Sequence, residues 1–176
     1  MRDIFLWFYC LPMVDAVMLV ILATAGFLYL REKFRDSPYW KMAVCLLFLL
    51  WLAVIYFGTL GNREEGGNFS QPNWIPFASY REVLHGGNRE IYRTNFMNAV
   101  LFYPAGLFGC AALPKSWKQP WKTLLMFALL MLVSAGIEYV QYRFHMGLPE
   151  TDDIIHNSLG ALLGTIACGL PKRKKS

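Results

Sequence analysis

The stretch MAVCLLFLLWLAVIYFGTL, Met42–Leu60, decides the class of fold, because it carries no charged side chain. A helix that spans a bilayer needs about 20 mostly apolar residues, and this run supplies them. Of the 176 residues in the chain, 56% are hydrophobic and 16% are charged. Soluble domains average about 45–50% apolar and about 25% charged residues. The balance excludes a soluble enzyme, a disordered tail and a nucleic-acid-binding module, and it predicts an integral membrane protein.

Four further apolar segments surround that run: Ile4–Leu30, Phe96–Leu113, Leu124–Tyr142 and Asp153–Leu170. We therefore expect an all-α membrane protein, a bundle of about five transmembrane helices. The first segment is too long for a signal peptide and is followed by a basic stop-transfer block, so it should remain as a helix.

The lysines predict the orientation of this bundle. All of them follow the first, third or fifth segment, and cytoplasmic connections retain Lys and Arg. The N-terminus is therefore predicted outside and the C-terminus inside. The expected parts are an N-terminal helix with a basic cytoplasmic loop (1–41), a four-helix transmembrane domain with an outer loop at 61–94 (42–170), and a basic cytoplasmic tail that meets anionic lipid (171–176).

The outer loop contains a predicted short helix over Ala78–Leu84, started by Pro76 and stopped by the pair Gly86 and Gly87. It follows Asn73 and would lie on the outer leaflet or fold back over the bundle. An ordinary surface loop is the alternative.

One polar side chain, that of Asn98, shares a face of the third segment with Phe102 and a small residue, Gly106. Asn98 and Gly106 lie two helical turns apart, and Pro104 between them frees a backbone carbonyl near Val100. Asn98 either bonds this kinked backbone or belongs to a binding site.

The fourth and fifth segments carry the sharpest polar stripes. Ser134, Glu138 and Gln141 follow one face near the outer end of the fourth. An ionisable group inside a membrane span is by default a functional-site hypothesis. The alternative for Glu138 is a structural ion pair with Arg93 or Arg143.

One face of the fifth segment carries polar residues at its outer end and glycines further in: Asp153, Asn157, Gly160 and Gly164. The glycines permit close helix approach, and Thr151 or Asp152 should cap the helix. Because the polar residues share one depth, we expect a ligand-binding pocket at the outer ends of the last three segments, formed by Asn73, Asn98, Glu138, Gln141, Asp153 and Asn157. Pro104, Gly106, Gly160 and Gly164 are then packing residues.

At these residues the chain resembles the VanZ-like family of bacterial membrane proteins. The resemblance rests on Asn73-x-x-Pro76-Phe77, Asn98-x-x-x-Phe102-x-Pro104-x-Gly106, Glu138-x-x-Gln141 and Asp153-x-x-x-Asn157-x-x-Gly160-x-x-x-Gly164. Many members carry an acid and an Arg before the last motif. Here Glu150 matches the acid, whereas the Arg position falls near Gly147 and Arg143 is the nearest arginine. The resemblance implies a place in the bacterial plasma membrane and a link to resistance against teicoplanin.

Three functions are compatible with these residues. The first is a binding or envelope-modulating protein whose pocket takes a membrane lipid, a cell-wall precursor or a lipoglycopeptide. The second is an intramembrane enzyme in which Glu138 and Asp153 act as acid and base. In a variant of this hypothesis the two carboxylates hold a divalent metal together with His156. The third is a small transporter or flippase. The chain lacks enzyme signature motifs and Cys/His ligand spacing, which favours binding over catalysis and predicts no metal and no cofactor.

Overall fold

The computed structural model describes residues 12–61, 63, 65–66, 71–86 and 90–170. The regular secondary structure of these residues is helical, apart from an isolated parallel bridge between Asn73 and Glu150. This confirms the all-α class for the part of the chain that is described. Residues 4–11 of the first expected segment, Gly87 of the helix stop and the 171–176 tail lie outside the described residues.

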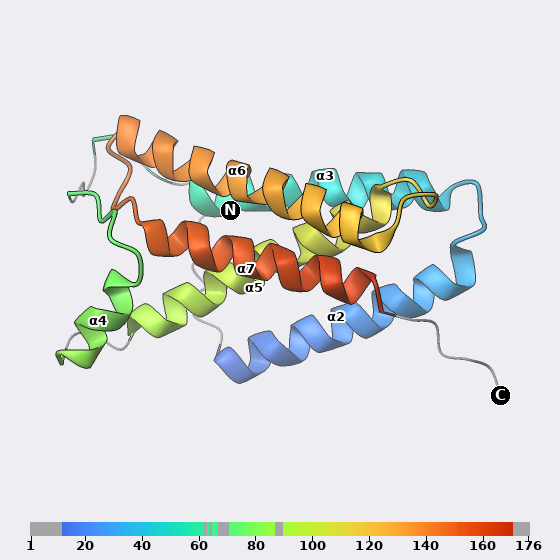
Figure 1. Cartoon of the computed structure of the whole chain (residues 1–176), viewed down its shortest axis with the longest axis horizontal. Helices are drawn as coiled ribbons and strands as arrows, with labels where there is room; N and C mark the ends of the chain where they lie inside the picture. The colour runs from blue at the N-terminus through green and yellow to red at the C-terminus, as the bar shows by residue number, and fades with distance from the viewer. Residues whose placement is uncertain (1–11, 62, 64, 67–70, 87–89, 171–176) are drawn as a thin grey trace.

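Five long helices and one short helix make up the described fold (Figure 1). They are α2 (Met13–Phe34), α3 (Trp40–Thr59), α4 (Ala78–Leu84), α5 (Glu90–Ala112), α6 (Gln119–Arg143) and α7 (Thr151–Cys168). Successive long helices run in opposite directions, and α4 lies at one end of the bundle beside the start of α5 (Figure 1). We call this end the α4 end. The predicted short helix over Ala78–Leu84 is confirmed, although it starts after Phe77 rather than at Pro76.

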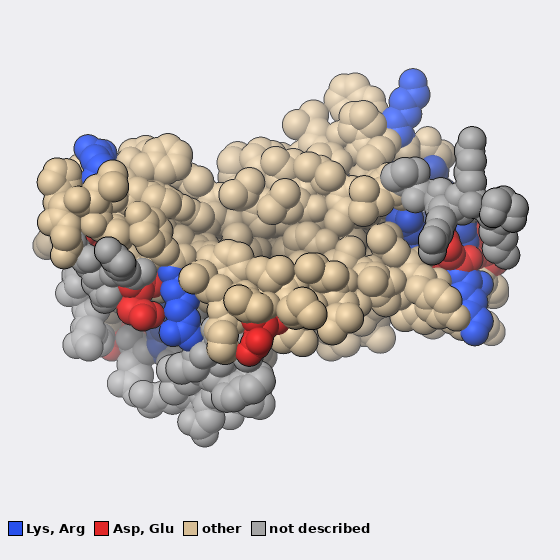
Figure 2. All heavy atoms as spheres, turned by 90° about the horizontal axis from the view of Figure 1, so that it is seen from below, with Lys and Arg blue, Asp and Glu red and all other residues tan. Residues whose placement is uncertain are grey.

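Three of these helices, α2, α3 and α6, are long and apolar enough to cross a membrane. Large apolar side chains on them face outward, including Leu22 at 63% exposure and Leu132 at 65%. Outward-facing Leu is costly in water and favourable in lipid. Figure 2 shows a broad surface that is largely without charge: most charged groups lie toward the two ends, and one acidic group lies near the middle. The count of five spans and the orientation stay predictions.

The helix boundaries differ from the expected segments at several ends. Helix α2 continues to Phe34, so Arg31 and Lys33 belong to its last turn rather than to the following loop. Helix α5 begins at Glu90, before the apolar part that starts at Phe96. Polar and charged residues at a helix end do not stop the backbone hydrogen bonds, whereas an apolar window marks only the lipid-facing part.

Helices α5 and α7 form the centre of the bundle, and α5 also contacts α2, α3, α4 and α6. Their axes approach closely because small residues line the contact. A Cβ added to Gly106 would lie 2.0 Å from the Ala161 carbonyl oxygen, and one added to Gly160 would lie 2.0 Å from that of Ala99. Gly164 faces the Tyr103 carbonyl oxygen in the same way. This tight pairing fixes the register between the polar ends of α5 and α7.

Pro104 lies inside α5, which continues past it. The carbonyl expected to be free was that of Val100. The structure instead shows a side-chain bond to the carbonyl one residue later: the Trp51 indole N–H donates to the Leu101 carbonyl oxygen at 2.8 Å. A proline also weakens the neighbouring backbone bond, which leaves this carbonyl open to a second donor. The bond ties α3 to the middle of α5.

Candidate functional site

Polar side chains from four helices are buried together at the α4 end. We call this group the buried polar cluster; it consists of Ser79, Tyr80, Asn95, Asn98, Ser134, Glu138, Gln141, Asp152, Asp153, His156 and Asn157. Most of them expose less than a tenth of their surface. A polar group buried without partners costs several kcal/mol in lipid surroundings, so the contacts of this cluster decide what it can do.

Two carboxylates lie at the centre of the cluster. Glu138 is 2% exposed, and its Oε2 accepts a hydrogen bond from the Glu150 backbone N–H at 3.0 Å. Asp153 accepts one from the Asn98 side-chain amide, with 2.7 Å between Nδ2 and Oδ1. The carboxylates are close enough to interact electrostatically with each other. The structure therefore brings Asn98, Glu138 and Asp153 together, as expected from the depth that they share in their helices.

Two buried amide groups beside the carboxylates are only half satisfied. The Gln141 amide donates to the Thr59 carbonyl oxygen at 3.1 Å, and the Asn157 amide donates to Ser134 Oγ at 2.9 Å. Their side-chain oxygens are buried and accept no hydrogen bond within the described part of the chain. Together with the carboxylates they make the cluster rich in acceptors. Such a site is complementary to hydroxyl, amide or ammonium donors.

Asp152 fastens α4 to this cluster. Its carboxylate accepts hydrogen bonds from the backbone N–H of Phe77 at 2.5 Å and of Ser79 at 2.9 Å, and also from the Ser79 hydroxyl. Asp152 thus caps α4, a helix remote in sequence. The prediction that Thr151 or Asp152 caps its own helix is wrong, because the N-cap residue of α7 is Glu150 and it makes no side-chain cap bond.

A second pair of contacts holds α4 against α5 and α7. The Tyr80 hydroxyl and His156 Nε2 are 2.6 Å apart, and the two rings stack. On the other side the Asn95 amide donates to Ser79 Oγ at 3.0 Å. Ser79, Tyr80 and Asn95 were not among the site residues expected from the sequence. The sequence does indicate their positions, since Ser79 and Tyr80 lie in the short helix after Pro76 and Asn95 lies near the start of α5.

Asn73 joins the loop before α4 to the start of α7. Its backbone N–H donates to the Pro149 carbonyl oxygen at 2.9 Å, and its own carbonyl oxygen accepts from Thr151 N–H at 3.0 Å. Glu150 lies between these bonds. Burial raises the pKa of the Glu150 carboxyl above its usual range, the nearby Asp152 carboxylate adds to this, and a hydrogen bond from Asn73 opposes it. The loop therefore covers the cluster as a docked segment.

Arg63 is the arginine that approaches the two central carboxylates. It interacts electrostatically with Glu138 and Asp153, and its Nη1 donates to the Met146 carbonyl oxygen at 2.8 Å. A Cβ added to Gly147 would lie 2.5 Å from the same Nη1. The guanidinium thus lies against the position where the family resemblance places an arginine.

The arginines named in the sequence analysis lie elsewhere. Arg93 pairs with Glu90 at 3.4 Å, and Arg143 lies over the Phe144 ring. Arg63 could not be found from the sequence, because it lies 84 positions before Gly147 in a loop without a recognisable motif.

The packing residues lie apart from the cluster. Gly106, Gly160 and Gly164 form the α5–α7 contact further along the bundle, and Pro104 lies beside them in α5. Across the residues described, no group of three or more His, Cys, Asp and Glu side chains could hold a metal ion.

Fold and site together define a class: an all-helical membrane protein with a buried, acceptor-rich polar cluster at one end of its bundle. The chain belongs to the VanZ/LLP1 family, whose model VanZ-LLP1 matches residues 39–171. The resemblance seen in the motifs is thereby confirmed. Searches of curated proteins and of solved structures returned no match.

Proposed function

We propose that this protein spans a bacterial plasma membrane several times, with the N-terminus outside and the C-terminus in the cytoplasm. In this orientation the α4 end lies in the outer leaflet. The lysines of the described residues support it, since all of them lie at or near the opposite end, on the last turn of α2, the first turns of α3 and α6, or the α5–α6 connection.

The ligand site in this proposal combines Asn73, from the loop that covers the buried polar cluster, with five members of that cluster: Asn98, Glu138, Gln141, Asp153 and Asn157. The observation that carries it is the pair of buried amide oxygens, of Gln141 and Asn157, which accept no hydrogen bond within the described residues. Fold stability alone gives no reason to bury such acceptors. A ligand rich in hydroxyl and amide donors would satisfy them, such as the sugar or peptide part of an envelope lipid, a cell-wall precursor or a lipoglycopeptide.

The biological role proposed is a contribution to teicoplanin resistance. The test is a susceptibility measurement in a glycopeptide-sensitive Gram-positive host, with teicoplanin and vancomycin side by side. Wild type should raise resistance to teicoplanin selectively, whereas Glu138→Gln and Asp153→Asn should abolish the rise at equal expression. Glu82→Gln, which neutralises an exposed carboxylate on α4, is the matched control and should behave as wild type.

An unchanged susceptibility with wild type, at confirmed expression in the membrane, would overturn the resistance role. Loss of expression in both cluster variants would assign the carboxylates to folding instead.

A second candidate is an intramembrane enzyme acting on an envelope lipid or glycan. The electrostatic contact between Glu138 and Asp153 favours it, because two interacting carboxyls can serve as acid and base. Turnover of a labelled envelope lipid by the purified protein, with a bell-shaped pH dependence lost in Glu138→Gln, distinguishes it from simple binding.

A further inference from the structure

A second, chemically opposite site lies at the end of the bundle away from α4. A cavity of about 660 Å³ opens there between the ends of α2, α5 and α7 and the beginnings of α3 and α6. Its lining holds five basic side chains: Arg31, Arg35, Lys41, Lys115 and Lys122. No acidic residue is among the described residues that line it. We call it the basic cavity.

Backbone carbonyl groups hold two of these cations in place, Arg31 and Lys115. The Arg31 guanidinium donates to the carbonyl oxygens of Cys168 and, at 3.2 Å, of Leu170, where α7 ends. Lys115 Nζ donates to the Arg35 carbonyl oxygen at 2.6 Å. These bonds hold one cation from α2 and one from the α5–α6 connection beside the same cavity.

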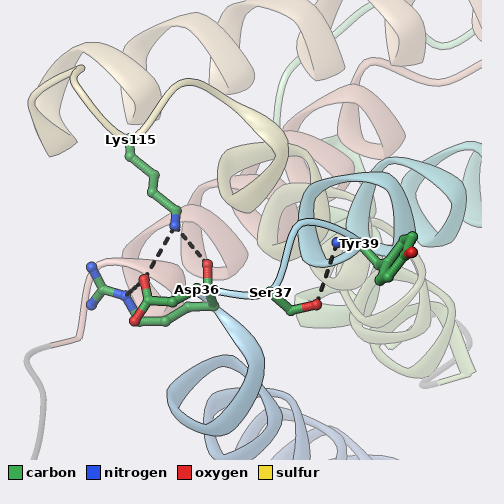
Figure 3. A network of polar contacts seen from close by, with 5 residues as sticks. Asp36, Ser37, Tyr39 and Lys115 are labelled. Carbon is green, nitrogen blue, oxygen red and sulfur yellow. Dashed lines mark hydrogen bonds and ion pairs between the residues drawn. The ribbon is translucent and has the colours of Figure 1, made fainter.

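The nearest carboxylate belongs to the rim rather than to the lining. Asp36 pairs with Lys115 at 3.5 Å and with Arg35 at 3.6 Å, and its side chain is 87% exposed. Figure 3 shows the Lys115 side chain pointing at Asp36 across the gap between the α2–α3 and α5–α6 connections, with Ser37 accepting a bond from Tyr39 N–H. One exposed carboxylate leaves the group of five cations with excess positive charge. Like charges gathered around one hollow repel one another, and a bound anion removes that cost.

An apolar groove adjoins the basic cavity. It measures about 580 Å³, lies between α6 and α7, and shares Gln119, Gly169 and Leu170 with the cavity. The remainder is lined by Pro120, Thr123, Leu124, Phe127, Leu162 and Ile166. A charged hollow continuous with an apolar groove matches a molecule that has an anionic head and a hydrocarbon tail.

We propose that the basic cavity and the adjoining groove bind an acidic phospholipid, with the phosphate among the five cations and one acyl chain along α6 and α7. Basic pockets between transmembrane helices on the cytoplasmic side are suited to phosphate headgroups. A free phosphate shares the headgroup chemistry but makes no use of the groove. This site is independent of the buried polar cluster and of any role in resistance.

The test measures binding of dioleoyl phosphatidylglycerol to the purified full chain in a neutral detergent, by microscale thermophoresis. Dioleoyl phosphatidylcholine, inorganic phosphate and glycerophosphoglycerol are the comparison probes. The variant Lys41→Gln/Lys122→Gln removes two cavity cations. Its matched control, Lys33→Gln/Lys118→Gln, removes the same charge at the same end from side chains that do not line the cavity. Unfolding midpoints establish that both variants fold.

Phosphatidylglycerol should bind more tightly than phosphatidylcholine, and Lys41→Gln/Lys122→Gln should weaken its binding by about thirtyfold. The control should stay close to wild type. Leu162→Trp, which fills the groove, should weaken the lipid and leave glycerophosphoglycerol unchanged.

Equal weakening in both double variants would overturn the site in favour of general surface charge. Inorganic phosphate that competes as effectively as glycerophosphoglycerol, with no effect of Leu162→Trp, would overturn the lipid assignment in favour of a free anion.

Discussion

The contact between Asp152 and α4 permits a quantitative prediction. Replacing Asp152 with Ala removes the acceptor for two backbone N–H groups at the start of α4 and for the Ser79 hydroxyl. Loss of an N-cap costs up to about 2 kcal/mol, and loss of a further hydrogen bond costs about 1 kcal/mol. The free energy that holds α4 closed should therefore fall by about 3 kcal/mol.

Backbone strain acts in the same direction. Phe77, directly before α4, has a φ of 61°, a left-handed conformation that bulky residues avoid. Its N–H is one of the groups that Asp152 binds. Once that bond is lost, Phe77 can relax, which favours opening of α4 further.

Amide hydrogen exchange measured by mass spectrometry on the protein in lipid nanodiscs is the assay. A change of about 3 kcal/mol corresponds to exchange about 150-fold faster for the α4 amides, with the α6 amides unaffected. Glu82→Ala, which deletes an exposed carboxylate from α4 itself, is the control and should exchange as wild type does. Identical α4 exchange in Asp152→Ala and wild type would refute the claim that Asp152 holds this helix.

Other expected outcomes concern packing and pH. Gly160→Ala should destabilise the protein by about 1–3 kcal/mol in chemical unfolding, because its Cβ would meet the Ala99 carbonyl oxygen at 2.0 Å. Gly136→Ala is the control and should not destabilise the protein, because the space around Gly136 is open. Equal stability of the two variants would contradict the close approach of α5 and α7. Because burial raises the pKa of Glu150, the folded chain holds this proton more tightly than the unfolded chain, so wild type should lose stability as the pH rises through that pKa. Glu150→Gln should lack this component of the pH dependence of the unfolding midpoint, and parallel profiles for the two proteins would show that Glu150 is not desolvated.

Much of the fold is readable from local patterns. Apolar runs predict α3 and α6 because lipid contact is a property of each helix alone. Helix α4 follows from turn residues at its two ends, and the 3.6-residue period places Glu138 with Gln141, and Asp153 with Asn157, on single faces. These are the parts in which neighbours in sequence decide the structure.

The remainder depends on contacts between distant segments. Asp152 caps α4, which precedes it by more than 60 residues, because α4 docks on the start of α7. Arg63 meets Gly147 through two loops, and Cys110 and Cys168, which are far apart in the chain, line the same cavity where α5 and α7 end. The basic cavity likewise combines the ends of five helices. The spacing of neighbouring residues in the sequence does not predict these contacts between distant segments.

The most direct test of the central claim is the unfolding midpoint of the double variant Glu138→Gln/Asp153→Asn. Each amide keeps an oxygen that can accept the bond from Glu150 N–H or from Asn98, while two buried ionisable groups that interact electrostatically with each other are replaced by neutral ones. If the carboxylates serve a ligand rather than the fold, the double variant should be as stable as wild type or more stable, as expected where a site trades stability for function. A marked fall in its midpoint would contradict the account, because it would show that the carboxylates hold the bundle together.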